Sequence, residues 1–266
     1  MSGTSRIFVI NLNRRADRLA LMAARLEKLG LDWERIEAID SDDPTLDGRV
    51  DWKKHRYYMQ LLPPRKAPVA CYFSHRLVWQ RMVDEHIEQA LILEDDVTAT
   101  SQWDAEILNI DLAAHGLDSL RLDHSRDMGP MPKAAYFEQT IGRWTVKNHN
   151  SWGAGATLMT RAGAQKCLSL GKMWFTADDY FMMNRVLGLR TALATPSLWW
   201  HPEETASDVA PPPSYWQQSN FIKKAISLMV TARMREAERS RIQKLRAASV
   251  FKEAALPKNA KPLNAN

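Results

Sequence analysis

An apolar segment that ends in three consecutive acids, residues 90–97 (ALILEDDV), constrains the fold more than any other stretch. An uninterrupted apolar run is typical of a strand that is buried on both faces of a sheet. Adjacent carboxylates repel one another and are costly to bury, so Glu94, Asp95 and Asp96 suit a divalent cation. In open α/β sheets, ligands bind at the carboxyl ends of the strands. Taken alone, the acids leave a metal site and an acidic turn about equally open.

The first forty residues predict a β-α-β unit. Residues 6–12 (RIFVINL) and 33–39 are strand candidates, and apolar residues recur between them at helical spacing. Asn13 is a candidate helix cap and Gly30 a candidate helix stop. Since strands joined by a crossover helix are usually parallel neighbours, we expect these two strands to pair in parallel.

Three basic residues, Arg14, Arg15 and Arg18, follow the first strand. Arginines near the start of a helix favour phosphate binding, although a solvated first turn is the common alternative. We favour the phosphate site because Asp95 and Asp96 should end at the same edge of the sheet.

The rest of the body predicts alternating helices and strands. Residues 41–66 lack periodicity and predict a long loop or a short helical insertion beside the ligand edge. The other predicted helices are 69–86, 101–115, 161–170 and one that ends near Gly188. The other predicted strands are 119–123, the antiparallel pair 136–137 and 143–146, a strand that runs into Thr160, and an edge strand at 190–194.

Trp152 stands beside Gly153 and Gly155, ahead of the strand that runs into Thr160, itself an expected N-cap. Glycines at this position let the backbone approach a ligand closely, or form a bulge. The Trp152 ring would stack on a sugar or pack in the core.

A pair of acids, Asp178 and Asp179, opens the next predicted helix. One acid at the start of a helix is expected, because the helix dipole stabilises a negative charge there. The second acid is then available for a catalytic role. His201 follows two tryptophans in a turn, and histidine is a suitable ligand for manganese.

Five segments, in order over residues 6–205, resemble glycosyltransferase family 25, which includes bacterial lipopolysaccharide galactosyltransferases. The segments are 6–12 with Arg15, Asp17 and Arg18; 70–75 (ACYFSH); 90–97; 153–158 (GAGATL) with 161–164 (RAGA); and 178–180 (DDY). The chain departs from the family pattern at Pro68-Val69, where a glycine usually precedes the cysteine.

The resemblance implies an α/β, GT-A-like nucleotide-sugar-binding fold with a mixed, mostly parallel central sheet. It also implies a metal-dependent, inverting hexosyltransferase that uses Mn²⁺ or Mg²⁺. The expected donor is a nucleoside-diphosphate sugar, most often UDP-galactose, and the expected acceptor is a glycan or lipooligosaccharide.

On this interpretation, Asp96 holds the cation with help from Asp95 and His201. Asp178 or Asp179 is the catalytic base, with Asp179 preferred. The residues expected to bind the nucleotide sugar are Asn11, Leu12, Arg15, Arg18, Asp40, Ser74, Glu94, Asp95, Trp152 and Gly153.

The basic charge is concentrated in the C-terminal tail. Residues 214–266 hold 11 Lys or Arg and 3 Asp or Glu, whereas residues 1–213 hold 25 and 28. Three prolines at 211–213 mark a boundary, so we expect a catalytic domain at 1–210 and a basic amphipathic helical tail at 211–266. The apolar stripe of the tail would enter an anionic membrane surface or pack against protein. It consists of Trp216, Phe221, Ile222, Ala225, Met229 and Ala232.

The sequence predicts a cytoplasmic location, with peripheral contact to the inner face of the membrane through the tail. No apolar run approaches the ~20 residues that span a bilayer, and the N-terminus lacks the apolar core of a signal peptide. Two functions compete with sugar transfer: nucleic-acid binding through the tail, and an inactive member of the family. The net negative body disfavours nucleic-acid binding.

Overall fold

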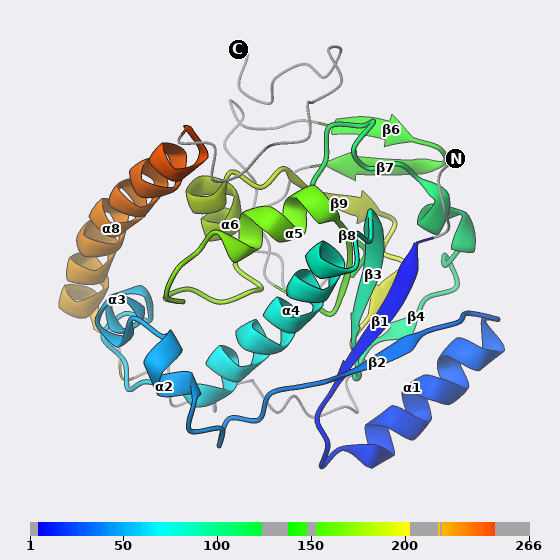
Figure 1. The fold of residues 1–266 in the computed structure, drawn as a ribbon, viewed down its shortest axis with the longest axis horizontal. Coiled ribbons are helices and arrows are strands. Elements are labelled where there is room, and N and C mark those ends of the chain that lie inside the picture. The colour runs from blue at the N-terminus through cyan, green and yellow to red at the C-terminus, as the bar shows by residue number, and fades with distance from the viewer. Residues whose placement is uncertain (1–4, 124–137, 148–152, 203–217, 219, 248–266) are drawn as a thin grey trace.

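The computed structural model describes residues 5–123, 138–147, 153–202, 218 and 220–247. Within them, an eight-stranded mixed sheet forms the centre of the fold, and helices cover both of its faces (Figure 1). The strand order is β2-β1-β3-β8-β5-β9-β7-β6. These strands are β1 (Arg6–Asn11), β2 (Glu34–Glu37), β3 (Gln89–Glu94), β5 (Ser119–Arg121), β6 (Glu138–Ile141), β7 (Trp144–Lys147), β8 (Ala156–Thr160) and β9 (Thr191–Thr195).

The pairing of the strands confirms the expected α/β fold with a mixed sheet. β1 pairs in parallel with β2 and β3, and β5 pairs in parallel with β9. β8 is inserted between β3 and β5 and is antiparallel to both. The hairpin of β6 and β7 extends the sheet by antiparallel pairing of β7 with β9.

A small second sheet pairs β4 (Thr98–Ala99) with β10 (Trp199–Trp200). β4 begins two residues after Asp96, and β10 ends immediately before His201. The small sheet therefore brings these two predicted site residues together.

Alternation along the central strands divides the core into two layers, because successive side chains of a strand point to opposite faces. Phe8 and Ile92 belong to the layer that includes α4, α5 and α6, whereas Val9 and Leu91 belong to the layer that includes α1. The helices are α1 (Ala16–Lys28), α2 (Leu46–Arg49), α3 (Trp52–Tyr58), α4 (Lys66–Asp84), α5 (Arg161–Leu168), α6 (Tyr180–Leu187) and α8 (Phe221–Ala247), with a 3-10 turn at Ala105–Asn109.

The helix ends follow local signals, with one exception. The Thr160 side chain accepts a hydrogen bond from Gly163 N at 3.0 Å, so the expected N-cap of α5 is confirmed. Gly188, at φ +64°, ends α6 as expected. Asn13 does not cap α1, because the helix begins at Ala16 with Arg15 at the N-cap position, and the Asn13 side-chain oxygen accepts a 2.9 Å hydrogen bond from Arg35 instead.

Other predictions of local structure need correction. Residues 101–115 contain only the short 3-10 turn Ala105–Asn109 and no α-helix, and Ile107, Leu108 and Leu112 pack into the core from it and the turns that follow. β9 is an internal strand and not an edge strand, because the β6–β7 hairpin adds to its outer side. Residues 41–66 include α2 and α3, so the helical insertion is the interpretation that the structure supports.

α8 lies along the outside of the molecule and packs on α3 and α6 (Figure 1). Glu238 is buried beside Lys54 at 3.1 Å, and Ile242 enters the core. The proposed boundary at residues 210–211 lies outside the described residues and stays a prediction. No helix in the described part of the chain is long and apolar enough to span a membrane.

Candidate active site

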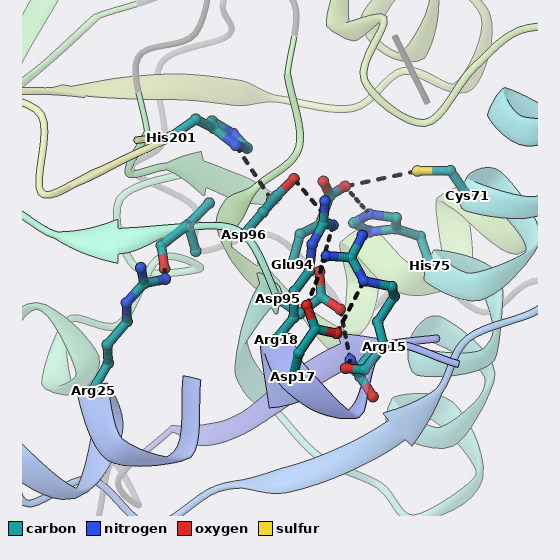
Figure 2. Close-up of polar contacts among 12 residues, drawn as sticks. Arg15, Asp17, Arg18, Arg25, Cys71, His75, Glu94, Asp95, Asp96 and His201 are labelled. Carbon is teal, nitrogen blue, oxygen red and sulfur yellow. Dashed lines mark hydrogen bonds and ion pairs between the residues drawn. The ribbon is translucent and has the colours of Figure 1, made fainter. Parts of the chain in front are cut away.

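The three acids at the end of β3 point in three directions (Figure 2). Glu94 points toward α4, where its carboxylate lies 3.0 Å from His75 Nε2 and accepts a 3.7 Å hydrogen bond from the Cys71 thiol. Asp95 points toward the β1–α1 junction, and Asp96 toward His201. The three acids therefore have different principal partners, although Asp95 and Asp96 share Arg18.

Asp95 is anchored inside the fold. Its carboxylate accepts hydrogen bonds from Asn11 Nδ2 at 2.6 Å and from Arg18 Nη1 at 3.1 Å. Asn11 also donates to the carbonyl of Arg15 at 3.0 Å, so the ends of β3, β1 and the start of α1 are fastened together. Burial raises the pKa of Asp95, and the bonds from Asn11 and Arg18 oppose that shift.

The imidazole of His201 lies between Asp96 and Asp123. Its Nδ1 atom is 3.3 Å from Asp96 Oδ1, and its Nε2 atom is 3.5 Å from Asp123 Oδ2. Asp123 follows β5 and is fully buried, where it also accepts a 3.1 Å hydrogen bond from Arg121. Arg18 Nη1 lies 3.7 Å from the other oxygen of Asp96. The predicted pair of Asp96 and His201 is thus adjacent.

The charges of this cluster stabilise one another. Burial acts to raise the pKa of Asp96, but His201 and Arg18 hold it below its ordinary value. Burial likewise opposes ionisation of Asp123, yet Arg121 and His201 lower its pKa to about 2. The two carboxylates outweigh burial at His201 and raise its pKa to about 10. At neutral pH and without metal, His201 is therefore a positively charged imidazolium between the carboxylates of Asp96 and Asp123.

Gly155 leaves the space that His201 occupies. A Cβ atom at Gly155 would lie 2.4 Å from His201 Nε2 and 2.7 Å from Val97 Cγ1. The close backbone approach expected of these glycines is found here, toward the imidazole. The Gly155 carbonyl also accepts a 2.8 Å hydrogen bond from Glu94 N, and Gly153 has a φ of +122°. Trp152 lies outside the described residues.

Asp178 and Asp179 have different surroundings. Asp179 is buried, caps α6 by accepting from Met182 N at 3.0 Å, and accepts from the Tyr58 hydroxyl at 2.9 Å. Asp178 is half-buried. Burial raises its pKa, the Thr176 side chain opposes the shift, and the charge of Glu94 adds to it. Asp178 is therefore more basic than an ordinary aspartate, while Asp179 stabilises the start of α6.

A pocket of about 420 Å³ lies at the carboxyl ends of β1 and β2. Its lining residues are Leu12, Asn13, Glu37, Ala38, Ile39, Asp40 and Asp43.

Three residues predicted to bind the nucleotide sugar, Leu12, Asp40 and Ser74, line this pocket or contact its lining. Leu12 and Asp40 line it, and Arg14 pairs with Asp40 at 3.2 Å. Ser74 supports the wall from behind, because its hydroxyl accepts a 2.9 Å hydrogen bond from Ile39 N. Arg15 lies at the start of α1 and pairs with Asp17 at 2.9 Å.

Sequence reasoning does not single out Asp123, Cys71 or His75 as site residues. Asp123 resembles Asp96 only in that it is an acid just after a buried strand, because β5 (SLR) is not an apolar run. Cys71 and His75 are four residues apart on α4 and therefore share a helix face. Their ligand atoms and that of Glu94 all lie within 4.8 Å of one another.

Comparison with known proteins shows one family. Residues 4–182 match the family model described as glycosyltransferase family 25 (LPS biosynthesis protein). A "Glycosyltransferase 25 family member" of Aedes aegypti is 29% identical over 176 residues, which are 62% of this chain and 28% of that protein. "Procollagen galactosyltransferase 2" of Homo sapiens is 26% identical over 189 residues, 64% of this chain and 29% of that protein. The chain spans less than a third of the length of these relatives.

Among solved structures, a glycosyltransferase involved in the glycosylation of the major capsid of PBCV-1 is similar with a TM-score of 0.39. The similarity covers 76% of this chain and 94% of that chain, with 11% sequence identity.

Proposed function

The chain belongs to glycosyltransferase family 25, and on this premise we propose that it is an inverting, metal-dependent hexosyltransferase. Its donor is UDP-galactose, and its acceptor is a hydroxyl of a glycan or lipooligosaccharide. The choice of galactose follows the human relative, a procollagen galactosyltransferase. The observation that carries the proposal is the acid-tipped strand β3 beside the pocket at the ends of β1 and β2.

The nucleoside of the donor occupies the pocket. Its volume of about 420 Å³ is suitable for a small-molecule site. The carboxylates of Glu37 and Asp40 can accept hydrogen bonds from ribose hydroxyls, and Leu12 and Ile39 offer apolar contact. Arg15 and the N-terminus of α1 bind the diphosphate.

Arg18 has a different role, because it is buried against Asp95 and Asp96. We propose that Arg18 holds Asp95 and Asp96 in place. Asp95, engaged by Asn11 and Arg18, is likewise an anchor in this proposal and not a metal ligand.

Asp96 and His201 would hold the divalent cation, and His201 would give up its Nδ1 proton on binding it, because a protonated imidazole cannot ligate a metal. A carboxylate oxygen and an imidazole nitrogen 3.3 Å apart form a donor set that suits Mn²⁺. Asp123 contacts the other imidazole nitrogen, as carboxylates commonly do behind a metal-ligating histidine. The residues therefore fit the metal. When bound, the cation supplies Lewis-acid neutralisation of the diphosphate leaving group.

Asp178 is the catalytic base. Its carboxylate takes the proton of the acceptor hydroxyl while that oxygen attacks the anomeric carbon. The bond from the anomeric carbon to the diphosphate breaks, and the nucleoside diphosphate leaves with the bonding electrons. A single displacement of this kind inverts the anomeric centre. The raised pKa of Asp178 makes it a stronger proton acceptor than an ordinary aspartate.

A lipid-linked saccharide is the acceptor that best explains the basic C-terminal helix. With such an acceptor, transfer takes place in the cytoplasm at the inner face of the membrane. Enzyme and acceptor would then share one surface, which raises their local concentrations.

A screen of nucleotide sugars tests the proposal. The full chain is incubated with Mn²⁺ and each donor, and nucleotide release and protection from thermal unfolding are measured. We expect UDP-galactose to give both signals, and EDTA to abolish release. Protection without release in the presence of any acceptor would instead indicate an inactive family member. Absence of protection by every nucleotide sugar would refute donor binding.

A further inference from the structure

Exposed apolar side chains are concentrated at the start of α8. Phe221, Ile222, Leu228 and Met229 have 84%, 66%, 73% and 62% of their surface exposed. Ile226 is also exposed, so five of the eight large exposed hydrophobic residues in the described part of the chain lie within residues 221–229. Isolated exposed hydrophobic residues are ordinary, but a contiguous group marks an interaction surface.

The apolar stripe faces away from the catalytic body. α8 contacts the body through Ser227, Glu238 and Ile242, which are buried and share one side of the helix. Ile222 and Met229 lie on the opposite side of the helix, and Phe221 and Leu228 lie at about a right angle to the buried side; all four are exposed. The described part of the body therefore leaves Phe221, Ile222 and Met229 of the predicted stripe exposed, and Trp216 lies outside the described residues. Figure 1 shows α8 on the outer edge of the fold.

The same half of α8 is basic. Residues 221–235 contain Lys223, Lys224, Arg233 and Arg235 and no Asp or Glu. The first acids of the helix, Glu236 and Glu238, follow this half, and Glu238 is buried against Lys54.

The neighbouring helix α3 extends the basic surface. α3 packs beside α8 and contributes exposed Lys53 and Arg56, and it too contains no acid. An apolar stripe flanked by bases on two adjacent helices is complementary to an anionic interface.

We propose that the outward face of residues 221–235 of α8 docks on an anionic lipid surface. The apolar side chains enter the interface between headgroups and acyl chains, and the Lys and Arg side chains contact the headgroups. A second copy of the chain is a poorer partner, because a two-fold contact through this face would bring like charges together.

Flotation of the full chain with vesicles tests the docking surface. Vesicles of phosphatidylcholine, with and without phosphatidylglycerol, are used at low and high salt. The test variant carries Phe221→Gln, Ile222→Gln, Leu228→Gln and Met229→Gln, which leaves the buried side of α8 unchanged. The matched control carries Leu21→Gln and Leu77→Gln, two exposed hydrophobic residues elsewhere.

We expect the wild type and the control to float with anionic vesicles at low salt, and roughly tenfold less of the test variant to float. Thermal unfolding should show that all three chains are folded. Lys223→Gln with Lys224→Gln should weaken flotation on anionic vesicles and reduce its salt dependence.

Failure of the wild type to float, or equal flotation of the test variant, would overturn the proposal. A wild-type dimer that the test variant converts to a monomer, without flotation of either, would identify the face as an interface between copies and refute lipid docking. The assay contains no nucleotide sugar, so its result is independent of the proposed transfer reaction.

Discussion

A Cβ atom at Gly155 would lie 2.4 Å from Nε2 of His201, so the imidazole occupies its position because residue 155 is a glycine. Gly155 directly precedes β8, whose backbone is fixed by pairing with β3 and β5. The antiparallel strand at the centre of the sheet therefore determines the space available to a candidate metal ligand.

Gly155→Ala is expected to displace His201 from Asp96 and Asp123. Loss of an oriented ligand commonly costs about 10–100-fold in metal affinity or activity. Titration of Mn²⁺ into the folded variant, followed by donor binding, measures the effect. Gly48→Ala is the control, because a Cβ atom there meets nothing within 4 Å. Wild-type Mn²⁺ affinity in Gly155→Ala would show that His201 does not bind the cation.

Asp96→Asn is expected to preserve the fold and to lose metal-dependent donor binding. The amide has nearly the size of the carboxylate but lacks the charge that a hard cation requires. Calorimetric titration of Mn²⁺ with and without UDP-galactose measures the loss. Asp111→Asn, at an exposed turn, is the control. Full turnover by Asp96→Asn, or equal turnover by the wild type in EDTA, would contradict metal dependence.

Asp178→Asn and Asp179→Asn should differ sharply in turnover. Removal of a general base commonly costs ~10²–10⁴-fold, so Asp178→Asn should lose turnover to this extent and still bind the donor. Asp179→Asn should remain close to the wild type, because asparagine is also a good N-cap and its amide NH2 can donate to the Tyr58 hydroxyl oxygen. The opposite outcome would identify Asp179 as the base, which is the preference from sequence alone.

Local patterns are sufficient to predict the β1–α1–β2 unit, α4 and β3. Their periodicities are clear and their ends carry ordinary stop signals, such as Gly30 at φ +65°. The insertion of β8 between β3 and β5 cannot be predicted from the local sequence. An apolar strand that is buried on both faces has the same sequence pattern whether it pairs in parallel or antiparallel. The short 3-10 turn at Ala105–Asn109 likewise depends on tertiary packing, which overrides helical propensity.

Candidate site residues can be predicted from their types, but their partners cannot. The run from Glu94 to Asp96 indicates a ligand edge, yet only the fold shows that Asp95 is engaged by Arg18 and Asn11. Asp123 joins His201 because Trp199 of β10 forms a backbone bridge with Asp123 itself. Such contacts between distant segments leave no signal in local spacing.

Arg18→Gln is expected to destabilise the fold strongly. The Arg18 side chain is buried between Asp95 and Asp96, and its loss leaves two buried carboxylates without this cation. Breaking a buried ion pair in this way costs about 3–5 kcal/mol. Urea unfolding without metal measures the free energy of unfolding.

Lys66→Gln is the matched control for Arg18→Gln, because Lys66 forms an exposed pair with Asp47 at 3.1 Å. The loss of such a pair costs about 0–1 kcal/mol. Equal effects of the two substitutions would show that Arg18 does not stabilise the acids.

Asp178→Asn is expected to raise the Tm at pH 7 in the absence of metal, although it abolishes turnover. Burial raises the pKa of folded Asp178 above the ordinary 3.8, so the folded chain binds this proton more tightly than the unfolded chain. The resulting stability is fully present below pH 3.8 and is lost as the pH rises through the folded pKa. Above that pKa the ionised, buried carboxylate lowers stability, and the amide removes this cost. Thermal unfolding from acid to neutral pH measures the difference in Tm between variant and wild type.

The Tm of Asp178→Asn minus the Tm of the wild type should therefore increase with pH. The same difference should decrease with pH when the substituted carboxylate has a pKa that folding lowers. Glu34 is such a group, because hydrogen bonds from Arg6 and Arg81 lower its pKa. Its contribution to stability is present above the unfolded pKa and is lost as the pH falls, so Glu34→Gln should destabilise the fold at pH 7 and have less effect in acid. If Asp178→Asn instead lowers the Tm at neutral pH as Glu34→Gln does, its surroundings favour the ionised carboxylate. The raised basicity that supports Asp178 as the catalytic base would then be wrong.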